Sequence, residues 1–80
     1  MADTEPYTDS LGRVLREQRT QKSLSQEELA HRVDLDRTYI SLLERGLRQP
    51  TLSTLVKISN ALEIQPEDFV AELGRPYKAD

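Results

Sequence analysis

Three side chains near the middle of the chain carry hydrogen-bonding groups at a spacing that suits recognition of another molecule. Arg37, Thr38 and Ser41 lie within about one turn of each other on a predicted helix. An arginine can donate two hydrogen bonds to guanine O6 and N7, and a hydroxyl can donate or accept. From these residues alone two interpretations stay open: a surface that reads nucleic-acid bases, and an ordinary solvated helix face.

The sequence does not indicate a catalytic or metal site. It has no Cys, and its one histidine, His31, has no cluster of metal ligands around it. Glu27 and Glu28 are adjacent, so they do not share a helix face and do not form an acid–base pair. Glu28 instead completes a capping box with Ser25. We therefore expect no enzyme activity, no cofactor and no small-molecule ligand.

Length and charge indicate one small domain. A chain of 80 residues without cysteine buries little core and has no disulfides, which favours self-association. Neither an apolar run of the roughly 18 residues needed to span a membrane nor a signal peptide is present, which predicts a cytoplasmic protein. The net charge is −3, but residues 11–49 carry eight basic and six acidic side chains. A basic binding face is therefore possible in the middle of the chain.

Helical periodicity predicts an all-α chain of five helices. Ser25, Asp36 and Thr51 are expected to cap the second, third and fourth helices, Gly46 to end the third, and Pro66 to open the fifth. The predicted helices span residues 9 or 10 to 21 or 22, 26–33, 37–45, 52–62 and 66–73. The fourth helix is expected to turn toward the core Leu52, Leu55, Val56, Ile58, Ser59 and Leu62. The predicted organisation is a flexible arm at 1–8, a domain at 9–74 and a tail at 75–80.

The second and third predicted helices form the most informative unit. A break at residues 34–36 separates them, and Leu35 is expected to fill it. Ala30 is small where two helices must cross closely, and Ile40 packs back from the second of the pair. This pattern is typical of a helix-turn-helix, whose second helix enters the major groove of DNA.

Residues 10–73 resemble the Cro/CI-type helix-turn-helix domain of phage and plasmid repressors, the XRE family. The segments that carry the resemblance are Arg13-Val-Leu-Arg16, Leu24-Ser-Gln-Glu-Glu-Leu-Ala30, Arg37-Thr-Tyr-Ile-Ser41, Leu43-Glu-Arg-Gly46 and Pro50-Thr-Leu52. The resemblance implies a compact five-helix, lambda-repressor-like DNA-binding domain with the helix-turn-helix at helices 2 and 3. The short length and the run at residues 35–41 most resemble the small controller proteins of restriction–modification systems. Those proteins are dimeric regulators that switch expression of an endonuclease relative to its methyltransferase.

Three positions depart from the pattern of the family. Asp34 and Glu63 stand where the family often has glycine. At Asp34 a left-handed backbone is expected, which aspartate tolerates at a higher cost than glycine. Leu42 stands where DNA-reading members often have a polar residue. It is expected either to contact a thymine methyl group or to fill space.

The resemblance assigns a set of side chains to DNA. Arg37, Thr38 and Ser41 are expected to read bases, and the residues expected to bind the sugar-phosphate backbone are Gln26, Tyr39, Arg45, Arg48 and Gln49. Gln26 also begins a helix, where free N–H groups favour anions. The alternatives are a plain helix start for Gln26, cover over the core edge for Tyr39, and a solvated loop for the last three.

The resemblance also implies a structural ion pair and a dimer. Arg19 and Glu44 match an arginine and a glutamate that pair, mostly buried, in the family. The last helix carries more apolar residues than a terminal helix needs, and the expected interface consists of Ile64, Phe69, Val70 and Leu73. The alternative is that these residues only cover the core of their own subunit.

The function predicted from these features is a sequence-specific regulator of transcription. It would bind double-stranded DNA as a homodimer on a pseudo-palindromic operator, with RNA polymerase as a further possible partner. The alternatives are a phage- or plasmid-type repressor, an antitoxin, and a protein-interaction module on the same fold. A salt titration separates the last from the others, because DNA binding weakens steeply as salt rises.

Overall fold

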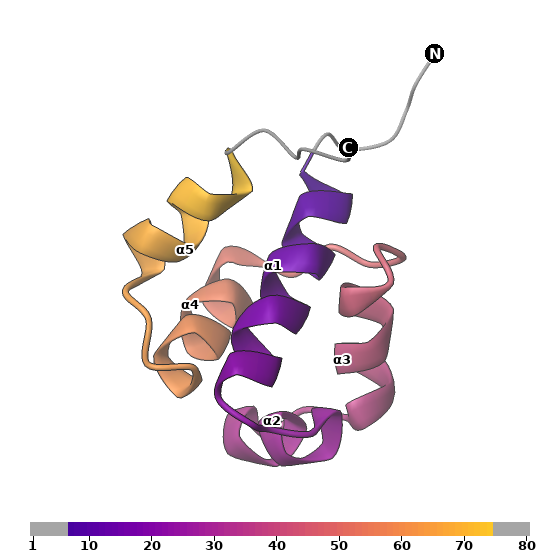
Figure 1. Ribbon diagram of the computed structural model, residues 1–80. Coiled ribbons are helices and arrows are strands. Elements are labelled where there is room, and N and C mark those ends of the chain that lie inside the picture. Colours follow the sequence, from indigo (N-terminus) through magenta and orange to yellow (C-terminus); the bar gives the residue numbers. More distant parts are fainter. Residues whose placement is uncertain (1–6, 75–80) are drawn as a thin grey trace.

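The computed structural model describes residues 7–74; the expected tail at 75–80 and residues 1–6 of the expected arm lie outside this range. All regular structure in the described part is helical (Figure 1), with α1 at Thr8–Gln21, α2 at Gln26–Val33, α3 at Arg37–Glu44, α4 at Leu52–Ala61 and α5 at Pro66–Leu73. The prediction of an all-α chain with five helices is confirmed. Thr8 was expected in the arm, but it begins α1 and is buried.

In Figure 1, α1 is drawn between α3 on one side and α4 and α5 on the other, with α2 at one end. Of these, α3 and α5 pack against α1, while α2 packs against α3 and α4, and α4 against α5. Gly12 allows the close approach of α1 and α3. A Cβ atom at this position would lie 2.4 Å from the backbone oxygen of Glu44 and 2.7 Å from that of Leu43. The end of α3 is therefore packed directly against the α1 backbone.

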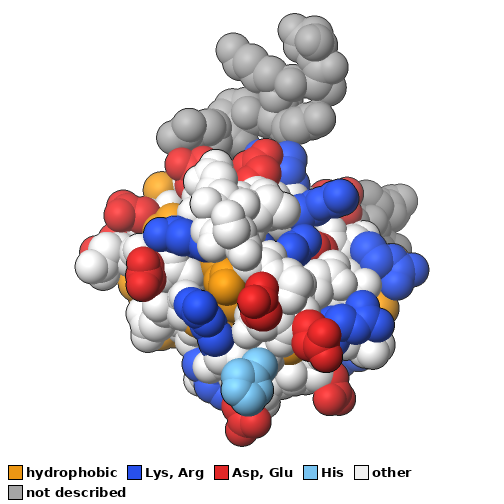
Figure 2. All heavy atoms as spheres, turned by 60° about the horizontal axis from the view of Figure 1, so that its bottom comes forward, with side chains coloured by type: hydrophobic (Ala, Val, Ile, Leu, Met, Phe, Trp, Pro, Cys, Tyr) orange, Lys and Arg blue, Asp and Glu red, His pale blue; other side chains and the backbone are white. Residues whose placement is uncertain are grey.

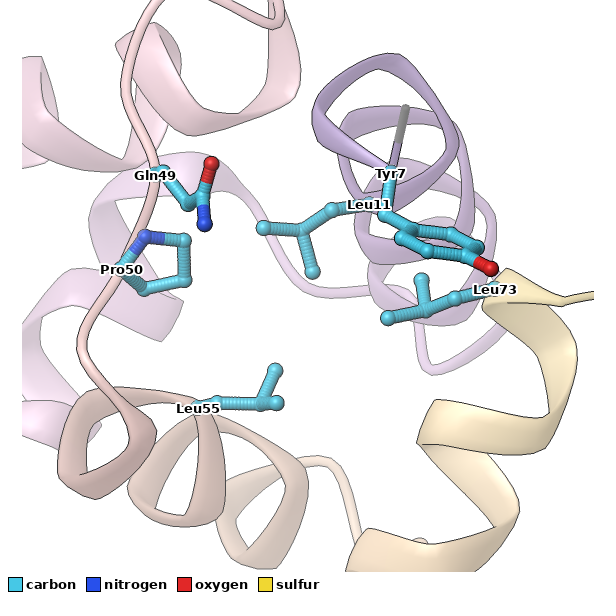
Figure 3. Close-up of a pocket in the computed structure, with 6 residues that line it drawn as sticks. All are labelled: Tyr7, Leu11, Gln49, Pro50, Leu55 and Leu73. Carbon is cyan, nitrogen blue, oxygen red and sulfur yellow. The ribbon is translucent and has the colours of Figure 1, made fainter. Parts of the chain in front are cut away.

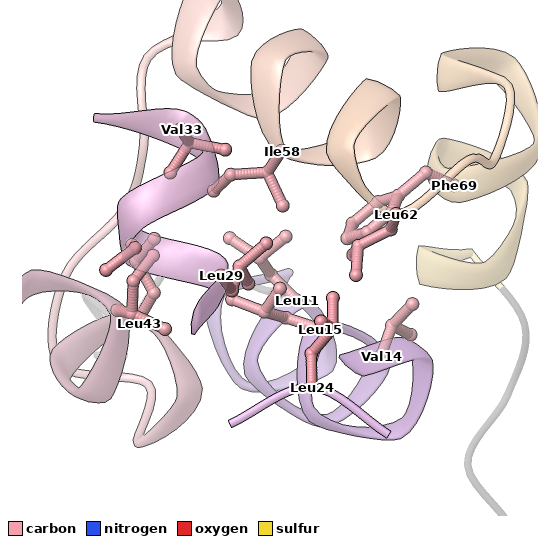
Figure 4. Close-up of a cluster of buried hydrophobic side chains, with 12 residues drawn as sticks. Leu11, Val14, Leu15, Leu24, Leu29, Val33, Leu43, Ile58, Leu62 and Phe69 are labelled. Carbon is pink, nitrogen blue, oxygen red and sulfur yellow. The ribbon is translucent and has the colours of Figure 1, made fainter. Parts of the chain in front are cut away.

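The core is built from apolar side chains of all five helices and of the loop before α2 (Figure 4), and comprises Leu11, Val14, Leu15, Leu24, Leu29, Ala30, Val33, Ile40, Leu43, Ile58, Leu62 and Phe69. Two expectations about this core and its surface are wrong. Leu52 was expected to face inward, but it is the first residue of α4 and is 75% exposed. Phe69 was expected at a dimer interface, but it is fully buried, because α5 turns this side chain into the core of its own subunit.

The connection between α2 and α3 has the geometry of a tight helix-turn-helix. The Ser25 hydroxyl accepts from the backbone N–H of Glu28 at 2.9 Å, and the Ser25 backbone N–H donates to Glu28 Oε1 at 2.7 Å. Hydrogen bonds from the Ser25 backbone and hydroxyl lower the pKa of Glu28 from its ordinary value. At the other end of α2, Asp34 adopts a left-handed conformation, and the backbone N–H of Leu35 donates to the backbone oxygen of Ala30 at 2.9 Å. The left-handed Asp34 and the bond from Leu35 end α2 and direct the chain into the turn before α3, whereas the Ser25 bonds fix the start of α2.

Three residues other than glycine have positive φ angles in the described range: Ser23 at 58°, Asp34 at 58° and Glu63 at 60°. The left-handed backbone expected at Asp34 is therefore present, whereas those at Ser23 and Glu63 were not predicted. Asp36 occupies the capping position of α3, but its side chain makes no capping hydrogen bond with the described residues. The expected capping position of Asp36 is therefore confirmed, without the side-chain hydrogen bond that often accompanies it.

Candidate nucleic-acid interface

The exposed face of α3 presents a row of hydrogen-bond donors. Arg37 and Thr38 are exposed at the start of the helix, and Ser41 is partly exposed one turn later. Arg45 is exposed at the end of α3 and continues the same row, because residues four apart lie on one helix face. Ile40 and Leu43 anchor the opposite face in the core. The helix therefore holds this row of polar groups outward on a rigid base.

An ion pair lies behind this row. Arg19 Nε donates to Glu44 Oε2 at 2.5 Å, and Arg19 Nη2 donates to Glu44 Oε1 at 3.1 Å. The two side chains are 11% and 4% exposed, and Arg19 Nη1 also donates to the Leu24 backbone oxygen at 2.7 Å. The structure thus contains the ion pair that the resemblance implied, and this pair joins the end of α1 to the end of α3.

Gln26 connects the ion pair to the exposed row. Its Nε2 donates to Glu44 Oε1 at 3.0 Å, and its Oε1 accepts from Arg37 Nη1 at 3.3 Å. The structure therefore brings Gln26 and Arg37 together. Gln26 was expected to bind the sugar-phosphate backbone of DNA, and Arg37 was expected to read bases. Sequence reasoning did not predict these two bonds.

A second contact joins α3 to the loop that follows it. The guanidinium carbon of Arg48 lies 5.7 Å from the centre of the Tyr39 ring, which is a cation–π distance. Tyr39 is partly buried and packs against the core, while Arg48 is exposed. The structure therefore places Tyr39 at the edge of the core, with a cation above its ring.

Gln49 lies apart from these groups. Its Oε1 accepts from the Thr8 hydroxyl at 3.2 Å, and Figure 3 shows it beside Pro50, across a pocket from Tyr7. The side chain therefore links the loop before α4 to the start of α1. Thr8 was missed by sequence reasoning, because no local signal connects residues 41 positions apart.

Charge is mixed over the face of the molecule that Figure 2 shows. Figure 2 shows Lys and Arg side chains on the side of the molecule where α3 lies, with Asp and Glu side chains between them. A mixed surface of this kind does not bind nucleic acid by bulk charge. Any DNA contact must therefore depend on the placement of individual donors such as Arg37 and Arg48.

An apolar groove lies on the other side of the domain, between the start of α1, α4 and α5. Tyr7, Leu55, Val70, Leu73 and Gly74 line a space of about 430 Å³. Tyr7 is 56% and Val70 48% exposed. The groove adjoins the pocket of Figure 3, which shares Tyr7, Leu55 and Leu73 with it.

The four residues expected at a dimer interface fall into three groups. Val70 is exposed at this groove, and Leu73 lines it. Ile64 is partly buried and packs against the core, and Phe69 is completely inside it. Sequence reasoning missed Tyr7, whose only signal was an aromatic residue just before the first helix.

Comparison with known proteins identifies the family. Residues 15–69 match the family described as Helix-turn-helix. The chain belongs to this helix-turn-helix family. Its members include transcriptional regulators, and the predicted resemblance to Cro/CI-type regulators and small controller proteins is confirmed.

Control proteins are among the relatives of this helix-turn-helix protein. Control protein C.BamHI of Bacillus amyloliquefaciens is 50% identical over 60 residues, which cover 74% of each chain. Control protein C.MunI of Mycoplasma sp is 41% identical over 65 residues, covering 80% of this chain and 88% of the relative. The crystal structure of the restriction–modification controller protein C.AhdI from Aeromonas hydrophila has 44% identity and a TM-score of 0.75, and the match covers 78% of this chain and 94% of that one. The predicted five-helix fold is thus confirmed by comparison as well.

The described residues form neither a metal site nor a membrane-spanning helix. Among residues 7–74, no group of three or more His, Asp or Glu side chains is placed to hold a metal ion. Within the same residues, no helix has the length and apolar character needed to cross a membrane.

Proposed function

We propose that this protein is a homodimeric, sequence-specific regulator of transcription that controls a restriction–modification system. The observation that carries the proposal is the exposed row of donors on α3, led by Arg37 and Thr38 and held on a rigid base. A helix of this kind fits the major groove, where an arginine fork distinguishes guanine from other bases by about 1–3 kcal/mol. The names of the control proteins to which the chain is similar support the controller role.

The remaining donors suit contacts with the sugar-phosphate backbone. Gln26 lies at the start of α2, and Arg45 and Arg48 are exposed at the end of α3 and in the loop after it. We assign these residues, with Tyr39, to phosphate contacts that position the protein and carry little sequence information. Gln49 belongs to the same group: its amide oxygen accepts from Thr8, which leaves its Nε2 group to donate to a phosphate.

The partners proposed are double-stranded DNA and a second copy of the chain. The groove at Tyr7, Val70 and Leu73 supports the dimer, since it exposes apolar surface that a small domain would bury against its own copy. Two reading helices in such a dimer would meet half-sites about 34 Å apart. We place the protein in the cytoplasm. The position of the operator in the promoter decides whether the bound dimer blocks RNA polymerase or recruits it.

The proposal is tested by selecting bound fragments from genomic DNA and titrating the best fragment at several salt concentrations. We expect an inverted repeat, lying beside a methyltransferase and an endonuclease gene. Arg37→Ala should weaken binding to it by about 1–3 kcal/mol and relax the preference at one base pair in each half-site. Arg16→Ala is the matched control, because Arg16 is an exposed arginine on α1 and should leave affinity unchanged. Failure to enrich any fragment above random DNA would refute DNA reading and favour a protein-interaction module.

The dimer is tested separately by sedimentation. Val70→Glu places a charge at the groove and should shift the protein toward monomer and weaken binding to the full operator. Leu52→Glu serves as the control, because Leu52 is more exposed but lies outside the groove-lining residues. Equal effects of the two substitutions would show that the dimer does not form through this groove.

A further inference from the structure

The hydrogen bonds behind α3 form one continuous chain from the ion pair to the surface. Arg19 holds the Glu44 carboxylate, Glu44 Oε1 accepts from Gln26 Nε2 at 3.0 Å, and Gln26 Oε1 accepts from Arg37 Nη1 at 3.3 Å. We propose that Glu44 is a positioning residue that sets, through Gln26, the orientation in which Arg37 meets a base. This inference rests on the proposed function, in which Arg37 reads DNA.

The direction of the hydrogen bonds gives the chain its specificity. A carboxylate only accepts hydrogen bonds, so the NH₂ end of the Gln26 amide must face Glu44. The carbonyl end of the same amide then faces outward, where it can accept from Arg37. A neutral partner in place of Glu44 could donate as well as accept, and the amide could turn over. Its NH₂ group would then face the Arg37 guanidinium, which also only donates.

The first members of the chain have little freedom to move. The Glu44 side chain is 4% exposed and receives two bonds from Arg19, which is itself tied to the Leu24 backbone oxygen. Gln26 is the first residue of α2, directly after the Ser25 capping box, so its backbone position is also set. Side chains of three helices therefore meet at the Glu44 carboxylate: Arg19 of α1, Gln26 of α2 and Glu44 itself.

Arg37 is the only mobile member, because it is exposed and has a long side chain. Its Nη1 group is occupied by Gln26, and its other N–H groups stay available for a base. An arginine held in this way loses less rotamer freedom when it binds than a free one does. The series of hydrogen bonds from Glu44 through Gln26 should therefore raise the selectivity of Arg37 for its base, in addition to any effect on affinity.

A phosphate contact by Gln26 is compatible with this role and has a different signature. Gln26 Nε2 has a second N–H, which can donate to a phosphate while the first donates to Glu44. Loss of a phosphate contact weakens binding to all sequences alike. Loss of the positioning chain instead lowers the preference at the base pair that Arg37 reads and leaves the preferences at other base pairs unchanged.

The experiment measures dissociation constants for the operator and for its three substitutions at each base pair, using the full chain. Arg37→Ala first identifies the base pair that Arg37 reads. Gln26→Leu then removes the amide that links Glu44 to Arg37 and keeps both bonds between Arg19 and Glu44. We expect a two- to tenfold loss of preference at that base pair alone, about the effect of one hydrogen bond. Glu44→Gln should produce the same selective loss.

Because Glu44→Gln leaves Arg19 buried without an anionic partner, the double variant Arg19→Met/Glu44→Gln is measured beside it. The double variant removes the unpaired charge of Arg19 and keeps an amide next to Gln26. The loss of preference at the base pair that Arg37 reads should therefore persist, and the protein should be better folded than Glu44→Gln. Ile58→Val is the control for lowered stability, since Ile58 lies in the core away from α3. It should leave every base preference unchanged.

Two results would overturn the inference. An equal loss at all base pairs in Gln26→Leu, or an unchanged preference in the double variant, would show that the chain does not position Arg37. An unchanged preference in Arg37→Ala would overturn the reading role itself, so this failure of the proposed function is distinguishable from a failure of the positioning chain.

Discussion

Removal of the Glu44 carboxylate should be among the most destabilising single changes in this protein. In Glu44→Ala, three donors lose their acceptor: Arg19 Nε, Arg19 Nη2 and Gln26 Nε2. The Arg19 side chain is 11% exposed, so water cannot readily replace the lost partner. Breaking a buried pair in this way costs about 3–5 kcal/mol, or a fall in melting temperature of roughly 12–40 °C for a domain of this size. A small single core supplies a net stability of about the same size, so much of the variant should be unfolded.

The measurement is thermal and urea unfolding followed by circular dichroism at several protein concentrations, because dimer formation makes the midpoint depend on concentration. Glu17→Ala is the matched control: Glu17 pairs with Arg13 at 3.6 Å on the exposed side of α1, and its loss should cost about 0.3–0.5 kcal/mol. The double variant Arg19→Met/Glu44→Leu should regain most of the stability, since it buries no charge. A loss below about 1 kcal/mol in Glu44→Ala, or a double variant as unstable as the single one, would refute the reasoning.

Three further predictions follow from single contacts. Gly12→Ala should destabilise the fold by about 1–3 kcal/mol or more in a melting experiment, because the new methyl group would lie 2.4 Å from the Glu44 backbone oxygen; an unchanged melting temperature would contradict this close approach. Hydrogen bonds from Ser25 lower the pKa of Glu28, so the wild-type protein should be more stable than Glu28→Gln above the ordinary pKa of a glutamate. This difference in the free energy of unfolding should vanish as pH falls through the lowered pKa. A difference that does not change with pH would contradict the stabilising role of the Glu28 carboxylate. Leu42 is partly exposed and is absent from the apolar side chains that pack on the core of residues 7–74, so it is free to contact a thymine methyl group. Replacing thymine by uracil in the operator should then weaken binding of the wild-type protein but not of Leu42→Ala. Equal effects on the binding of both proteins would show that Leu42 only fills space.

The local features of the fold were predictable to within a residue or two. The capping box at Ser25 and Glu28 and the left-handed residue Asp34 depend on interactions within a few residues, and both are present. The prediction was less reliable where burial decides the outcome. Leu52 follows the apolar spacing of α4 but precedes the part of that helix that other helices cover, so it is exposed. Periodicity identifies an apolar face without showing how far along the helix the neighbouring helices extend.

The candidate site divides in the same way. That Ser41 neighbours both Arg37 and Thr38 on the helix surface, four and three residues after them, follows from helix geometry. The Arg19–Glu44 pair followed from the family resemblance. The link from Glu44 to Gln26 joins residues 18 apart, and the link from Thr8 to Gln49 joins residues 41 apart. Neither has a local signal in the sequence, because side chains that far apart meet only when helices pack.

The sequence by itself determined the five helices, the side-chain caps at Ser25 and Thr51, the break between α2 and α3, and the polar groups that α3 carries. These features depend on interactions over three or four residues, which are the same wherever the helix lies. Tertiary packing alone decided that Phe69 fills the core while Val70 stays at the surface, and that Gln26 lies between Glu44 and Arg37. Adjacent residues on one helix have equal access to solvent until another helix covers one of them, so the assembled core decides which of them remain available to a partner.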